Sequence, residues 1–134
     1  MNVLIIDGQG GGIGRMLVGA VKSAYPEVTV TAVGTNSAAT AAMLKAGADL
    51  AATGENAVCV GCRSADVIAG PVGIVIADAL LGEITPKMAV AVGQSRAKRV
   101  LVPMNHCDNM VVGVDDVQVS KLIQAAVKEI GKDA

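Results

Sequence analysis

The chain has 134 residues, 52% of them hydrophobic, and its 11 basic residues nearly balance 12 acidic ones. This length predicts a single domain, residues 1–134, while the near-neutral charge and a single aromatic residue argue against a nucleic-acid partner. No apolar run approaches the roughly 18 residues of a membrane span, and no basic leader precedes the first strand, so we expect a cytoplasmic protein with no membrane partner.

The first half of the chain alternates apolar strands and amphipathic helices. A buried strand is predicted at 2–6, a helix at 12–24 and a second strand at 28–33. Asn36 or Ser37 can cap the next helix, which ends at Gly47. The following stretch has no clear period, and its Val-Cys-Val run at 58–60 is interpreted as a short strand.

The second half continues this alternation. A strand is expected at 66–69, followed by a second loop with two glycines at 70–73 and a helix at 74–81. A further helix should run from Thr85-Pro86 to about 94, with strands at 99–102 and 110–114. The final helix has Leu122, Ile123, Ala126, Val127 and Ile130 on one face. The whole pattern predicts a three-layer α/β domain with a mostly parallel, Rossmann-like sheet. A flavodoxin-like strand order is the alternative.

The first strand leads directly into residues 7–14, which we call the glycine loop. Its Gly8-x-x-x-Gly12-x-Gly14 pattern resembles the TGxxxGIG loop of short-chain dehydrogenases, with Asp7 at the Thr position. Such a loop before a helix can hold a phosphate on backbone N–H groups, although a tight turn without ligand has the same residues. The candidate contacts are Asp7, Gly8, Gln9, Gly10, Gly11, Gly12, Ile13 and Gly14. Asp7 could hold Mg²⁺, but capping of the turn is the favoured role.

The end of the second strand bears on which cofactor would bind. An NAD site has an acidic residue there, and an NADP site has a nearby Arg. This chain instead has Thr35 and Asn36, which could bond a ribose or a phosphate but carry no charge. NAD is therefore not supported and NADP only faintly, so the cofactor is left unidentified, with NADP or another nucleotide as candidates. The Tyr-x-x-x-Lys pair of short-chain dehydrogenases is missing, because the residue four after Tyr25 is Thr29.

Further candidates lie after the later strands. Gly70 and Gly73, with Asn105 and Cys107, should reach the same edge of the sheet and close the crevice. His106 next to Cys107 also allows a base and a nucleophile.

A zinc site could combine Cys59-x-x-Cys62 with His106 and Cys107. Cysteines three apart on an extended strand face opposite sides, so we interpret the first pair as buried structural residues and predict no metal.

The apolar segment 74–81 predicts association with a second copy of the chain. A helix that is apolar all round is buried, and so small a domain would bury it against another subunit, which favours a homodimer. Two other functions stay open. One is an enzyme completed by oligomerisation, with Glu55, His106 or Cys107 as catalyst. The other is an interaction module that uses segment 72–82 and binds no ligand.

Several stretches together carry a family resemblance over the whole chain. They are 6–14, 34–40, 43–48, 52–57, 70–74, 81–89 and 102–107. The chain resembles the small bacterial proteins known as domain of unknown function 3842. The resemblance implies a bacterial, cytoplasmic, single-domain protein, and it supplies no activity. Cys107 fits the family pattern, whereas Cys59 and Cys62 do not. The polar turn at 53–56 is a further place where side chains could contact a ligand.

Overall fold

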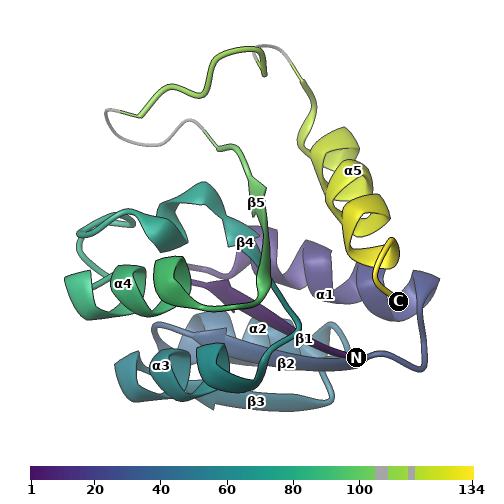
Figure 1. Cartoon of the computed structure of the whole chain (residues 1–134), viewed down its shortest axis with the longest axis horizontal. Helices are drawn as coiled ribbons and strands as arrows, with labels where there is room; N and C mark the ends of the chain where they lie inside the picture. The colour runs from purple at the N-terminus through teal and green to yellow at the C-terminus, as the bar shows by residue number, and fades with distance from the viewer. Residues whose placement is uncertain (105–108, 115–116) are drawn as a thin grey trace.

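The computed structural model describes residues 1–104, 109–114 and 117–134. In this part of the chain, strands and helices alternate from one end to the other (Figure 1). The strands are β1 Asn2–Asp7, β2 Thr29–Gly34, β3 Leu50–Thr53, β4 Val67–Pro71 and β5 Lys98–Val102. The helices are α1 Gly12–Ala24, α2 Ser37–Lys45, α3 Glu55–Ser64, the short 3₁₀ helix η1 Val72–Val75, α4 Pro86–Gln94 and α5 Val119–Gly131.

All the described strands pair in parallel in one sheet, in the order β3-β2-β1-β4-β5. This confirms the expected α/β class, and the order matches the first five strands of the Rossmann fold. Chain order reverses between β1 and β4, where Val3 pairs with Val67. The carboxyl ends of β1 and β4 therefore flank the switch point, which is where open α/β sheets bind ligands.

Helices cover both faces of the sheet (Figure 1). The side chains of β1 alternate between the two layers, because successive residues of a strand point to opposite faces. Val3 and Ile5 pack with α1, α2 and α5, whereas Leu4 and Ile6 pack with α3 and α4. All four are almost fully buried, so β1 forms the centre of the core and holds its last residue, Asp7, in a fixed position.

The prediction for 58–60 was wrong, because these residues lie inside helix α3. The buried side chains of this helix are Val58, Cys59 and Cys62, a helical spacing that the Val-Cys-Val run concealed. The strand in this region is β3, which the sequence did not reveal. All its residues are exposed at the sheet edge, so it lacks the apolar pattern that marks a buried strand.

The helix predicted at 74–81 was also wrong. Only one 3₁₀ turn forms, at η1, and residues 76–84, here called the turn segment, fold back in successive tight turns. Asp78, Leu80 and Leu81 have positive φ angles of 67°, 56° and 56°, which a helix does not allow. Ile74 and Leu80 are buried within the same chain. These side chains therefore no longer argue for burial against a second subunit.

The strand predicted at 110–114 is absent from the described residues 109–114, where the backbone forms a turn. Met110 and Val112 are exposed, so their spacing does not mark a buried face. The predictions for the last two helices were more accurate.

Thr85 caps α4 as expected, by accepting a hydrogen bond from the Met88 N–H at 3.2 Å. The predicted apolar face of α5 includes Ile123, which is buried.

Candidate functional site

Asp7 organises the glycine loop from the end of β1. Its carboxylate is buried, with Oδ1 accepting the Gly8 N–H at 2.8 Å and Oδ2 accepting the Gly14 N–H at 2.7 Å. The two bonds join the end of the strand to both ends of the loop. This is the capping role expected for Asp7, and it holds the start of α1 against the carboxyl end of β1.

The glycines of the loop have different structural roles. Gly11 has a φ of 72°, the left-handed conformation that glycine adopts without strain. A Cβ at Gly14 would lie 2.5 Å from Met43 Sδ and 2.8 Å from the Asp7 Cβ, so this glycine lets helix and strand pack closely. At Gly10 and Gly12, by contrast, a Cβ would meet no atom within 4 Å. These two positions face open space.

Three backbone N–H groups at the start of α1 are available to a ligand. Within the described part of the chain, no hydrogen bond uses the N–H of Gly10, Gly12 or Ile13. All three residues line a cavity of about 290 Å³, together with Arg15 and with Pro71 from β4. The cavity therefore lies at the switch point of the sheet, and it is lined by residues whose amides have no acceptor among the described residues.

Glu83, from the turn segment, contacts both the glycine loop and the residues that follow β2. Its Oε1 accepts three hydrogen bonds: from Gln9 N–H at 2.9 Å, Thr35 Oγ1 at 2.5 Å and Asn36 Nδ2 at 2.7 Å. The Thr35 bond, followed by those of Gln9 and Asn36, lowers the pKa of this carboxyl group, so Glu83 is ionised at neutral pH. Sequence reasoning missed this residue, because no spacing links position 83 to positions 9 and 35.

Thr35 and Asn36 lie beside the glycine loop as predicted, but their side chains are already engaged. Asn36 Oδ1 caps α2 by accepting the Ala39 N–H at 2.9 Å, and its Nδ2 also donates to the Gln9 carbonyl at 3.0 Å. Neither residue lines the 290 Å³ cavity. Direct contact of these side chains with a ligand therefore stays a prediction, and the structure shows them orienting Glu83.

Of the second loop, residues 70–73, only Pro71 lines the cavity, and the two predicted glycines do not. Gly70 is buried in β4, where a Cβ would collide with the Ile6 carbonyl. Gly73 lines a separate apolar space of about 20 Å³ beside Leu80. Pro71 is the β4 residue that lines the larger cavity. Asn105 and Cys107, like His106, lie outside the described residues, so their predicted roles stay predictions.

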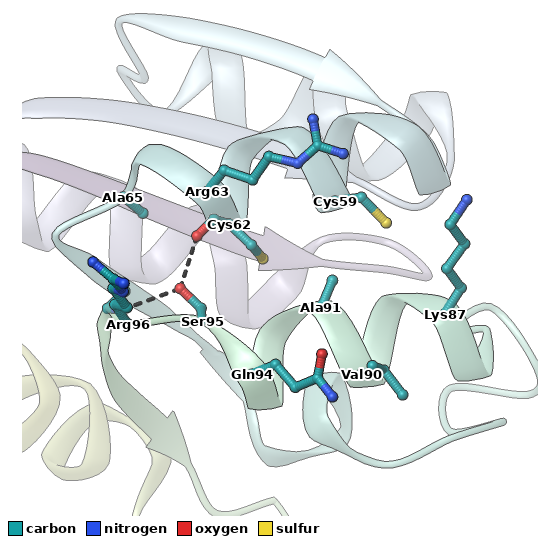
Figure 2. A pocket seen from close by; sticks show the side chains of 11 residues that line it. Cys59, Cys62, Arg63, Ala65, Lys87, Val90, Ala91, Gln94, Ser95 and Arg96 are labelled. Carbon is teal, nitrogen blue, oxygen red and sulfur yellow. Dashed lines mark hydrogen bonds between the residues drawn. The ribbon is translucent and has the colours of Figure 1, made fainter.

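A larger space, about 460 Å³, lies between α3 and α4, and we call it the α3–α4 groove (Figure 2). Cys59 and Cys62 share one face of α3 and point their sulfurs toward α4. Burial raises the pKa of the Cys62 thiol to about 11, and the neighbouring Cys59 adds to this effect, so the thiol is neutral and unreactive at pH 7. Both cysteines are free.

The remaining catalytic candidate, Glu55, lies at the first turn of α3. Its Oε2 accepts a hydrogen bond from Thr85 Oγ1 at 2.6 Å, and it does not line the glycine-loop cavity. Within residues 1–104, 109–114 and 117–134, no three His, Cys, Asp or Glu side chains gather closely enough to hold a metal ion. No helix in that same part of the chain is long and apolar enough to cross a bilayer.

Comparison with known proteins identifies the family. A search of curated proteins finds no match. Among solved structures, one match is a dodecameric FMN-dependent UbiX-like decarboxylase from Escherichia coli O157:H7, with 18% identity and a TM-score of 0.48 over 98% of this chain and 76% of that one. This likeness is too weak to support any inference. A family model matches residues 2–134, so the chain belongs to the family described as domain of unknown function (DUF3842).

Proposed function

We propose that the protein binds a nucleotide or another phosphorylated small molecule, with a phosphate group on the N–H groups of Gly10, Gly12 and Ile13. The observation that carries this proposal is that three amides without an acceptor among the described residues line one cavity at the start of α1. Unpaired N–H groups and the positive end of the helix dipole together attract phosphate.

The charges around the cavity support an anionic ligand. Arg15 lines the cavity, and the first turn of α1 contains no acidic residue. The carboxylate of Asp7 is nearby, and its oxygens accept the amides of Gly8 and Gly14, so it is engaged in shaping the loop. The space of about 290 Å³ is at the small end of the range for ligand sites, which favours a mononucleotide over a dinucleotide.

The test compares two glycines of the same helix. At both Gly12 and Gly19, a Cβ would meet no atom within 4 Å, so Gly12→Val and Gly19→Val should both fold. Only the first places a side chain beside the unpaired amides. We expect ADP and inorganic pyrophosphate to raise the melting temperature of the wild type and of Gly19→Val, because ligand binding stabilises the native state, and to leave Gly12→Val unchanged.

Differential scanning fluorimetry measures these shifts, and isothermal titration calorimetry gives the affinities. An equal ligand-induced shift of the melting temperature in Gly12→Val and Gly19→Val would show that the ligand does not bind at the glycine loop. A wild type that binds neither ADP nor pyrophosphate would overturn the proposed function itself. Homodimer formation, a cytoplasmic location and a bacterial origin remain predictions beside this proposal, and sedimentation of the purified protein tests the first of them.

A further inference from the structure

The carboxylate of Glu83 occupies a position that matters in nucleotide-binding sheets of this strand order. In the Rossmann fold, an acidic residue after the second strand accepts hydrogen bonds from the ribose of the nucleotide. Here β2 is followed by the uncharged Thr35 and Asn36. Glu83 reaches the end of β2 from the turn segment and accepts hydrogen bonds from both of these side chains.

Glu83 also touches the glycine loop directly. It accepts the Gln9 N–H at 2.9 Å, and a Cβ built at Gly8 would lie 3.0 Å from its Oε1. Gly8 and Gln9 both line the 290 Å³ cavity. Glu83 itself does not line the cavity, so a ligand whose phosphate lies on the amides of Gly10, Gly12 and Ile13 would reach this carboxylate by extending past Gly8 and Gln9.

One oxygen of Glu83 is left for that ligand. Oε1 accepts three hydrogen bonds, whereas no hydrogen bond within the described residues uses Oε2. An ionised carboxylate offers about four acceptor positions, so Oε2 keeps its capacity to accept. The three donors on Oε1 orient the carboxylate, and Oε2 is the oxygen that can accept a hydrogen bond from a ligand hydroxyl.

We propose that Glu83 is the ribose-reading residue of this site: Oε2 accepts a hydrogen bond from the 2′-hydroxyl of a nucleotide bound at the glycine loop and rejects a 2′-phosphate. This inference rests on the proposed function. A hydroxyl donates to a carboxylate, whereas a phosphate at the same position brings a second negative charge and no donor. The ligand class is thus narrowed to nucleotides with a free ribose 2′-hydroxyl, which disfavours NADP.

The test uses the conservative variant Glu83→Gln. Its Oε1 can still accept the three donors, while an amide nitrogen replaces Oε2 and donates instead of accepting. Isothermal titration calorimetry is run with ADP, 2′-deoxy-ADP, 2′-phospho-ADP and inorganic pyrophosphate. In the wild type, ADP should bind about tenfold tighter than the 2′-deoxy and 2′-phospho forms, as expected for a hydrogen bond to a charged acceptor.

In Glu83→Gln, the affinity for ADP should fall to that of 2′-deoxy-ADP, the affinity for 2′-phospho-ADP should rise, and pyrophosphate binding should not change. Equal binding of ADP and 2′-deoxy-ADP by the wild type would overturn the inference while the proposed function stands. Equal loss of every probe in the variant would also overturn it, because Glu83 would then only tie the turn segment to the loop. The titrations of the wild type with the four probes test the inference even if the variant fails to fold.

If the wild type binds none of the probes, pyrophosphate included, the proposed function is overturned as well.

Discussion

The glycine-loop cavity and the α3–α4 groove are both open spaces, and they differ in how their polar groups are used. In the groove, which is the larger at about 460 Å³ against 290 Å³, the Ser95 hydroxyl links two backbone groups. Ser95 Oγ donates to the Cys62 carbonyl at 2.7 Å and accepts the Ala97 N–H at 3.1 Å (Figure 2). At the glycine loop, three residues whose amides have no acceptor in the described chain line one cavity.

This difference shows why cavity size alone does not identify a site. Ligand sites combine a space with a few convergent polar groups that the protein itself does not satisfy. The glycine-loop cavity has such groups on backbone atoms, whose positions are fixed by β1 and α1. The groove presents Arg63, Lys87 and Arg96, which are side chains on its rim with no common point of convergence (Figure 2).

The largest effect is expected from removing the carboxylate that shapes the glycine loop. Asp7→Ala leaves the buried N–H groups of Gly8 and Gly14 without their acceptor, which should lower the free energy of unfolding by about 2–4 kcal/mol. Urea denaturation measures this change. Ser95→Ala, which removes the matching link in the groove, should cost only about 1 kcal/mol. An Asp7→Ala protein as stable as the wild type would show that the loop does not depend on this cap.

A second comparison separates packing glycines from ligand-facing ones. Gly14→Ala forces a Cβ against Met43 and Asp7 and should destabilise the protein by about 1–3 kcal/mol. Gly12→Ala points into open space and should stay within about 0.5 kcal/mol of the wild type. Thermal denaturation of the two variants gives the answer. Equal destabilisation would mean that Gly12, too, is required for the backbone.

A third prediction asks which region attracts the anion. Arg15 lines the glycine-loop cavity and Lys87 lines the groove, so Arg15→Gln and Lys87→Gln remove one positive charge from each. Arg15→Gln should weaken pyrophosphate binding roughly fivefold, as for loss of one partly exposed ion pair, and Lys87→Gln should not change it. Titration calorimetry at one salt concentration measures both. The reverse pattern would move the site to the groove.

The smallest effect concerns the groove thiol. Because the pKa of Cys62 is raised to about 11 from 9.0, burial of the neutral thiol stabilises the fold below pH 9, and this contribution disappears as the pH rises through about 11. At pH 7, iodoacetamide should alkylate Cys62 much more slowly in the native protein than in urea, with the peptide followed by mass spectrometry. Equal rates in the two conditions would show that the groove exposes a reactive thiol.

The elements that the sequence predicted well are those whose residues show a buried pattern. The strand at 2–6 and the helix at 12–24 match β1 and α1 closely, because every side chain of the strand after Asn2 and one face of the helix are buried. The exposed strand β3 left no such pattern. The turn segment is as apolar as a helix in sequence, but its left-handed residues lie in tight turns closed by backbone bonds such as Asp78 N–H to the Ile84 carbonyl, and Leu80 packs into the core.

The candidate site divides in the same way. The amides of Gly10, Gly12 and Ile13 were predicted because they are local: a strand, a glycine loop and a helix follow each other along the chain. Glu83 was missed because it reaches Gln9 across 74 positions. The missing acidic residue after β2 was interpreted as evidence against an NAD-type site, and in the structure the Glu83 carboxylate bonds to Thr35 and Asn36 there.

The sequence by itself therefore determined the α/β class, the alternation of strands and helices, and a loop with backbone donors at the start of a helix. Each of these follows from short-range periodicity and from the conformational freedom of glycine. Only the tertiary structure decided the strand order, the burial of Ile74 and Leu80 within one chain, and the position of Glu83. These features depend on contacts between distant residues, which the energetics of packing select and no local pattern encodes.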